Sequence, residues 1–357
     1  MIKQKTIQMS FSDAYLAKRK IKTQFFDQIN QIVEWDEIDT IVKRYYQKGV
    51  SVSGRPSYSG LLLFKMCLLQ TWYNLSDYEL EERVNDCLSF MRFLGLTLED
   101  DVPDHSVISR FRTELTLKKG FKPIMKAVNK QLEKHHVIIR TGVLLDASVT
   151  NTLRKPKGKT TYEIADDRKE TERSEEDKEK ETHSQRLIKQ IQPGVDTEAR
   201  WLKKGGKLHY GYKKHQLTDT EGLVLNVVTT SANESDIKHF EDVLEGVELA
   251  ENTPVYADKG YASKKNRLTL KEKKLKDRIQ HKAIKNKPLS KWEIVFNSLI
   301  SKIRYKIERT FGSQKLLLGA GLARYIGLEK THTQHLMEAI AYNLYRSPGI
   351  IMSCRKK

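Results

Sequence analysis

The sequence predicts an α/β protein in which an N-terminal all-helical domain precedes a larger domain built on a mixed sheet. Two changes in the hydrophobic pattern support this division. Apolar residues recur at helical spacing from about residue 36 to 135, and from Val137 they form the short runs and alternations that are typical of strands. Residues 1–35 are polar and of mixed charge, so we expect an N-terminal arm. The second domain is expected to extend over residues 137–352.

The helical domain contains two segments with clear signals. Residues 60–73 (GLLLFKMCLLQTWY) are densely apolar and predict a buried helix. Ser76, followed three residues later by Glu79, forms a capping-box signature, so a second helix is expected to begin there and to end at Gly95.

A short basic helix is expected after Asp104 or Ser106, either of which could cap it. This helix would display Arg110 and Arg112. A short helix, a turn and a short basic helix form the outline of a helix-turn-helix element, whose second helix can lie in the major groove of DNA. The alternative is an ordinary helical bundle with solvated arginines.

The second domain is predicted from its order of strands and helices. That order, β-β-β-α-β-α-β-α with long crossovers before the later strands, predicts a mixed sheet flanked by helices, which is the ribonuclease H-like plan. We expect strands at residues 137–150, 207–219, 223–231, 254–258 and 278–284, and helices at residues 236–249 and 264–275.

Residues 154–200 do not follow this plan. They contain almost no core-forming residues and are dense in both charges. Such a composition cannot bury enough apolar area to offset the entropy of the chain, so we expect a disordered or loosely helical insertion. A single solvated helix is the alternative.

Composition favours a polyanionic partner. The chain has 64 Lys and Arg against 46 Asp and Glu, a formal charge of +18, which favours nucleic acid through counterion release. A merely basic protein is the alternative. There is no run of about 18 apolar residues and no apolar signal core, so we expect no membrane span and a cytoplasmic protein. The three cysteines lack metal-ligand spacing and are expected to be reduced.

Three acidic residues occupy contexts that suit a two-metal site. Asp146 and Asp258 each follow an apolar run, and Glu308 lies on a long amphipathic helix. Carboxylates at strand ends, together with one from a packed helix, can hold two hard cations. Gly260 permits a tight turn just after Asp258. Asp146 alone could equally be a helix cap or a loop residue.

The helix of Glu308 places other charges near it. Arg304, Glu308 and Lys315 cluster beside an apolar stripe that is formed by Phe296, Leu299, Ile300, Ile303, Ile307 and Phe311. The alternative for Arg304 and Glu308 is a surface ion pair worth about 0.2–0.5 kcal/mol. Lys315 joins this face only if the helix continues through Gly312, which costs about 1 kcal/mol relative to Ala.

These residues carry a family resemblance. Asp146, the block Asp258-Lys259-Gly260-Tyr261 and the pattern Arg304-x3-Glu308-x6-Lys315 resemble the DDE signature of bacterial insertion-sequence transposases, in particular the insertion sequence five family. Residues 54–96 and 102–112 resemble the helical domain of that family, and residues 196–215, 230–236, 255–261 and 321–346 resemble blocks of its catalytic domain. Two departures occur: Ser301 stands where the family often has Tyr, and Ser235-Asp236 where it commonly has His-Asp.

The resemblance implies a DNA transposase that cleaves the ends of its element and joins them to target DNA. Asp146, Asp258 and Glu308 would bind two Mg²⁺ or Mn²⁺ ions, while Arg304 and Lys315 would contact phosphates near the scissile bond. The expected partners are the terminal inverted repeats and the target DNA, with a homodimer or higher oligomer on that DNA.

The lysines of the strand at residues 207–219 are expected to extend the DNA-binding surface. Lys207, Lys213 and Lys214 are interleaved with Tyr210 and Tyr212. The alternative is a solvated strand edge that the lysines keep from aggregating.

Asp236 is expected to be a helix cap. His209, His215 and His239 have no clear metal-ligand partners and are left out of the site. Two other functions stay open. One is a catalytically silent repressor derived from a transposase, against which the intact acidic triad argues. The other is a ribonuclease H-like nuclease without strand transfer, against which the helical domain argues.

Overall fold

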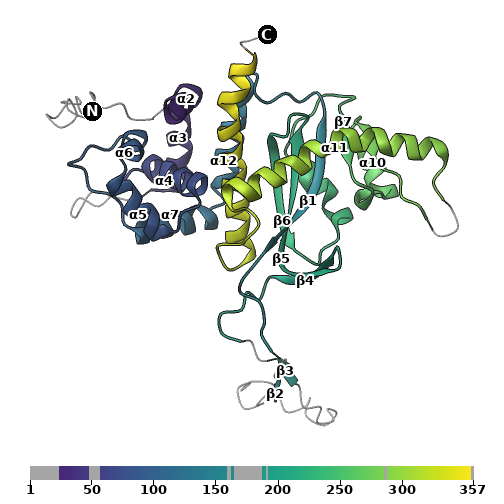
Figure 1. Ribbon diagram of the computed structural model, residues 1–357, viewed down its shortest axis with the longest axis horizontal. Helices are drawn as coiled ribbons and strands as arrows, with labels where there is room; N and C mark the ends of the chain where they lie inside the picture. The colour runs from purple at the N-terminus through teal and green to yellow at the C-terminus, as the bar shows by residue number, and fades with distance from the viewer. Residues whose placement is uncertain are drawn as a thin grey trace, which may run out of the picture.

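The computed structural model describes residues 24–47, 57–158, 162–164, 187–189, 192–284 and 288–354. The N-terminal helices gather on one side and the sheet on the other, with the long C-terminal helix between them (Figure 1). The first part of the chain forms α2 (Gln24–Ile32), α3 (Trp35–Tyr45), α4 (Gly60–Tyr73), α5 (Asp77–Asp86), α6 (Leu88–Leu94), α7 (His105–Leu117) and α8 (Phe121–Lys134).

The helical part confirms the strongest local signals and corrects one. Helix α4 occupies the expected residues, and Ser76 and Glu79 form the capping box, in which the Ser76 hydroxyl accepts from the Glu79 amide at 3.2 Å. The single helix expected up to Gly95 is two helices, because Cys87 adopts an extended conformation between α5 and α6. Asp104 caps α7 by accepting from the Val107 amide at 2.9 Å.

The sheet has the predicted mixed topology, in the order β4-β5-β1-β7-β8 with β6 paired to β5. Strands β4, β6 and β1 each pair antiparallel with β5, whereas β1, β7 and β8 are parallel. The strands are β1 (Val143–Asn151), β4 (Arg200–Lys204), β5 (Lys207–Asp219), β6 (Val224–Ser231), β7 (Pro254–Ala257) and β8 (Lys276–Ile279). The first strand therefore begins later than expected, and the last begins and ends earlier.

Helices cover both faces of this sheet. They are η3 (Asp236–His239), α9 (Phe240–Leu244), η4 (Lys259–Tyr261), α10 (Lys264–Glu272), α11 (Lys291–Leu318) and α12 (Leu328–Cys354), where η denotes a 3-10 helix. The helix expected at residues 236–249 is thus a 3-10 turn followed by a short α-helix. Helix α11 runs unbroken through Gly312, as the placement of Lys315 requires.

Much of the expected charged insertion lies outside the described residues. Within it, β2 (Tyr162–Ile164) pairs antiparallel with β3 (Leu187–Lys189). Its C-terminal end belongs to the fold, because Asp196 is fully buried and accepts a hydrogen bond from the Tyr212 hydroxyl at 2.7 Å. The insertion expected up to residue 200 therefore ends earlier, by residue 196.

One apolar core joins the helical part to the sheet. The Trp72 indole of α4 donates to the Ala341 carbonyl of α12 at 2.8 Å, and the Asn343 amide of α12 donates to the Val224 carbonyl of β6 at 2.7 Å. Helix α2, which lies in the segment expected to be a polar arm, buries Phe26 and Ile29 in this core. The boundaries drawn from the sequence at residues 35, 135 and 137 stay predictions.

Candidate active site

The three acidic residues come from three elements that pack side by side. Parallel pairing of β1 with β7 sets Leu145 beside Ala257, so Asp146 and Asp258 follow at neighbouring positions. Asp146 lies inside β1 rather than at its end, because the strand continues to residue 151. Helix α11, which carries Glu308, packs against both strands.

Arg304 lies among the three carboxylates. Its Nη2 atom is 2.7 Å from Oδ2 of Asp146, and its Nη1 atom is 3.8 Å from Oδ1 of Asp258. The distance from Nη2 to Oε1 of Glu308 is 3.9 Å, the longest of the three. The Arg304 side chain is only 9% exposed, so a surface ion pair with Glu308 does not describe it.

Burial decreases across the site from Asp146 to Glu308. The side chains of Asp146, Asp258 and Glu308 are 18%, 37% and 62% exposed. Burial raises the pKa of Asp146, and the charge of Arg304 offsets part of that rise. The site therefore opens to solvent on the side of Glu308, where a substrate can approach.

The chemistry of the donor set fits divalent cations. Carboxylate oxygens are the ligands that Mg²⁺ and Mn²⁺ prefer, and three carboxylates around one guanidinium leave an excess of negative charge when all are ionised. Among the described residues, no group of three Asp, Glu, His or Cys side chains is arranged to hold a metal ion. Arg304, the near partner of Asp146, lies within ion-pairing distance of all three carboxylates.

Positive charge continues along α11 beyond the carboxylates. Lys315 is exposed, and its pKa is lowered by partial burial and by the nearby charges of Lys214 and Lys204. Lys207, at the start of β5, is exposed as well. Lys315 and Lys207 are therefore accessible to a polyanion. Two of the other residues expected to contact DNA are not.

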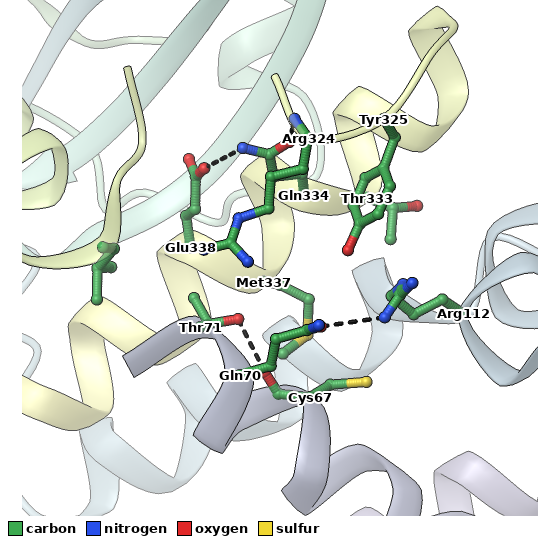
Figure 2. Close-up of a pocket in the computed structure, with 11 residues that line it drawn as sticks. Cys67, Gln70, Thr71, Arg112, Arg324, Tyr325, Thr333, Gln334, Met337 and Glu338 are labelled. Atoms are coloured by element: carbon green, nitrogen blue, oxygen red, sulfur yellow. Dashed lines mark hydrogen bonds between the residues drawn. The ribbon is translucent and has the colours of Figure 1, made fainter. Parts of the chain in front are cut away.

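Arg112, expected as a DNA contact, is an interior residue. Its guanidinium donates to both oxygens of Asp77 at 2.7 Å and to the Gln70 side chain at 3.0 Å. Figure 2 shows Arg112 turned towards Gln70 and lying near Tyr325, in a pocket between α4, α7 and α12. Arg110, two residues earlier on the same helix, is exposed and stays available.

The lysines of β5 differ in the same way. Lys214 is 1% exposed and donates to Glu338 at 2.9 Å, which corrects its expected place on the surface. Lys213 points to the opposite face of the sheet, where it donates to Asp236 at 2.9 Å. Helices cover both faces of the sheet here, so strand alternation buries both side chains.

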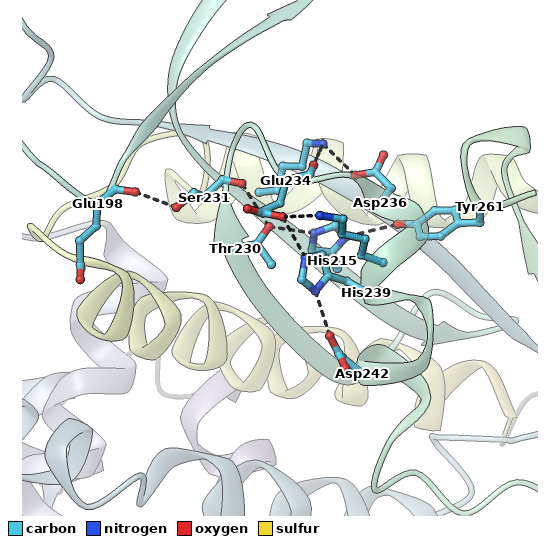
Figure 3. A network of polar contacts seen from close by, with 11 residues as sticks. Glu198, His215, Thr230, Ser231, Glu234, Asp236, His239, Asp242 and Tyr261 are labelled. Atoms are coloured by element: carbon cyan, nitrogen blue, oxygen red, sulfur yellow. Dashed lines mark hydrogen bonds and ion pairs between the residues drawn. The ribbon is translucent and has the colours of Figure 1, made fainter. Parts of the chain in front are cut away.

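Asp236 does not cap a helix. Ser235 holds the N-cap position, and Asp236 begins η3 with its carboxylate bound to Lys213. Two of the histidines left out of the site, His215 and His239, lie in one polar network with Asp236 (Figure 3), where His215 contacts the Thr230 hydroxyl at 3.1 Å. His209 instead contacts the Asn151 side chain at 3.0 Å. Burial lowers the pKa of His215 to about 4, so its ring is neutral at pH 7.

Sequence reasoning missed two polar residues that support the site. Gln280, just after β8, lies 3.5 Å from Arg304 and also donates to Ser301 at 2.8 Å. Asn266 joins the segments that carry Asp236 and Asp258 through two hydrogen bonds to their backbone. Gln280 directly follows β8 as Asp258 directly follows β7, which is a signal that could have found it. Asn266 had none.

The ribonuclease H-like sheet, with an acid on β1, one after β7 and one on α11, defines a DDE transposase. The chain belongs to that family: the family described as "Transposase DDE domain" matches residues 139–344, and "Transposase domain (DUF772)" matches residues 14–114. A similar protein is the transposase for insertion sequence element IS1106 of Neisseria meningitidis serogroup B. It is 32% identical over 240 residues, which cover 67% of this chain and 76% of that protein. No solved structure matches the chain.

These findings confirm the predicted fold class and the predicted family. None of the described helices has the length and apolarity that a bilayer crossing requires.

Proposed function

We propose that this chain is an active transposase that cleaves the ends of its own insertion sequence and transfers them to target DNA in the cytoplasm. The observation that supports this most is the gathering of three carboxylates, one on β1, one just after β7 and one on α11, around one guanidinium. Asp146, Asp258 and Glu308 would hold two Mg²⁺ or Mn²⁺ ions. When bound, the ions would activate a water or a DNA 3′-hydroxyl and stabilise the leaving oxygen.

Arg304 is proposed to bind a phosphate beside the scissile bond. Its guanidinium bonds to Asp146, so a cation and the guanidinium compete for the same carboxylate. A guanidinium freed from that carboxylate keeps its fork of donors, which suits a phosphate. Lys315 lies on the same helix and adds a second positive charge for the DNA backbone.

The proposed DNA surface also includes Lys207 on the sheet and Arg110 on α7, which are both exposed. Arg112 and Lys214 are left out because their charges are paired inside the fold. The formal charge of +18 supports binding that weakens as salt rises. We expect a homodimer or higher oligomer to form on the DNA.

The test is cleavage of a duplex that carries the terminus of the element. Asp146→Ala, Asp258→Ala and Glu308→Ala should each lower the cleavage rate by about 10³-fold or more, because loss of a ligand destroys the metal geometry. Chelator should have the same effect, and Mg²⁺ or Mn²⁺ should restore only the parent. Glu251→Ala, which removes an exposed carboxylate paired with Lys274, is the matched control and should cleave normally.

The outcomes separate the functions that the sequence left open. Undiminished cleavage by Asp258→Ala would remove the proposed site. A parent that binds the terminus but does not cut it with either metal would be a repressor, and cutting without joining would indicate a nuclease.

A further inference from the structure

The turn that follows Asp258 is held in place by residues on the face of the sheet opposite to α11. We propose that Lys213 and Asp236 form a positioning pair that fixes the turn at residues 258–262 and thereby sets the place of Asp258. The effect on catalysis rests on the proposed function, whereas the effect on the turn does not.

Lys213 anchors the pair to the sheet. It lies on β5, opposite Val149 of β1, and its side chain is 11% exposed. Its ammonium group donates to Oδ1 of Asp236 at 2.9 Å and to the Glu234 carbonyl at 2.6 Å. Through these two hydrogen bonds, Lys213 holds the segment before η3 against β5. Its ammonium group is therefore poorly placed to bind DNA.

The other carboxylate oxygen of Asp236 lies beside the turn. A Cβ atom placed on Gly260 would lie 3.9 Å from Oδ2 of Asp236 and 3.8 Å from Oδ2 of Asp258. Gly260 therefore lies beside both carboxylates. Asp236 and Asp258, which come from different segments of the chain, therefore lie on either side of the same residue, Gly260.

Asn266 ties the same two segments together at a second point. Its buried side-chain amide donates to the Tyr261 carbonyl at 2.9 Å and to the Ile237 carbonyl at 3.2 Å. Within the turn, the Tyr261 amide donates to the Asp258 carbonyl at 2.9 Å, and the Tyr261 side chain is 1% exposed. Figure 3 shows Tyr261 and Asp236 in one polar network with His215. The segments η3 and η4 therefore form one unit, which Lys213 attaches to β5.

Losing the pair should weaken metal binding more than it slows the loaded enzyme. Groups that orient a metal ligand typically change metal affinity by about 10–100-fold when they are removed. Asp236→Asn and Lys213→Met break the same pair but change the local charge in opposite directions. An effect of charge alone would therefore shift the Mn²⁺ requirement in opposite directions, whereas a positioning effect shifts both upwards.

The experiment uses the full chain and two readouts. Hydrogen exchange should become about tenfold faster at the amides of residues 258–262 in both variants. The Mn²⁺ concentration for half-maximal cleavage should rise about tenfold or more, with the rate at saturating Mn²⁺ largely kept. The double variant should be no worse than either single variant, because the two act as one pair. Lys213→Arg should restore part of the affinity.

The control is the exposed pair of Lys265 on α10 and Glu241 on α9, whose charged groups are 3.8 Å apart. Lys265→Met and Glu241→Gln should change neither readout. Unchanged exchange in both Asp236→Asn and Lys213→Met would overturn the proposal, as would opposite shifts in the Mn²⁺ requirement. A parent that fails to cleave would count against the proposed function alone, because exchange would still decide the pair.

Discussion

Two buried arginines, Arg112 and Arg304, differ in the number of carboxylates that surround their guanidinium groups. Arg112 meets a single carboxylate, Asp77, and bonds to both of its oxygens at 2.7 Å. Arg304 meets three carboxylates, of which only Asp146 is within 3 Å, and its Nε atom has no hydrogen-bond partner among the described residues. Around Arg112, one positive charge meets one negative charge. Around Arg304, the three carboxylates leave negative charge in excess when all are ionised.

The pKa values of the two near aspartates shift in opposite directions. Burial alone would raise the pKa of Asp77, but the hydrogen bonds and the charge of Arg112 outweigh burial and lower it. Burial raises the pKa of Asp146, and there the single guanidinium does not outweigh it. A matched pair stabilises the fold, whereas we expect an unmatched cluster of carboxylates to attract further cations.

The largest expected effect is on stability. Asp77→Ala should lower the free energy of unfolding by about 3 kcal/mol or more, because it leaves Arg112 buried without a counter-ion. Glu308→Ala should change it by less than about 0.5 kcal/mol, because Glu308 is exposed and belongs to the unmatched cluster. Denaturant unfolding of the two variants measures both values. Equal losses would erase the distinction between the clusters.

A smaller effect is expected from metal. Mn²⁺ at about ten times its dissociation constant should stabilise the parent by about 1.4 kcal/mol for one ion, because it binds only the folded chain. Asp258→Ala should lose this gain, and Asp77→Asn should keep it despite its lower stability. Thermal unfolding with and without Mn²⁺ provides the measurement. A gain that survives in Asp258→Ala would place the cations elsewhere.

The smallest effect is the order in which the two aspartates take up protons. As the pH falls in the metal-free protein, Asp146 should protonate before Asp77, because its folded pKa is raised and that of Asp77 is lowered. Asp77 therefore contributes stability that is lost only as the pH falls through its lowered pKa. Protonation of Asp146 instead relieves the cost of a buried charge. Carboxyl chemical shifts measured against pH decide the order.

The sequence was sufficient for most of the elements and for singling out the three acids that the structure gathers around Arg304, whose catalytic role stays a prediction. Strand runs before Asp146 and Asp258, and the helical pattern around Glu308, depend on residues close to each acid. The capping box at Ser76 is equally local, and it formed as predicted. Local patterns of this kind survive folding because few distant contacts compete with them.

The sequence could not predict in the same way which charged side chains pair with one another inside the fold. Nothing near Arg112 or Arg110 in the sequence shows which of them meets Asp77, because that contact joins α7 to α5. The sequence does not show that Lys213 and Lys214 are both buried, because their burial depends on elements that cover both faces of β5. The break at Cys87 carries neither Gly nor Pro to mark it. Each of these depends on packing between elements far apart in the chain.

The core that α12 shares with α4 and β6 also bears on how such a protein can evolve. The bonds from Trp72 to Ala341 and from Asn343 to Val224 cross between the helical part and the sheet. An exchange of gene segments that replaced only the helices would expose this apolar surface and leave buried polar groups without partners. Change in DNA recognition is therefore expected to arise through substitutions on exposed faces, such as that of Arg110, rather than by replacement of a whole module.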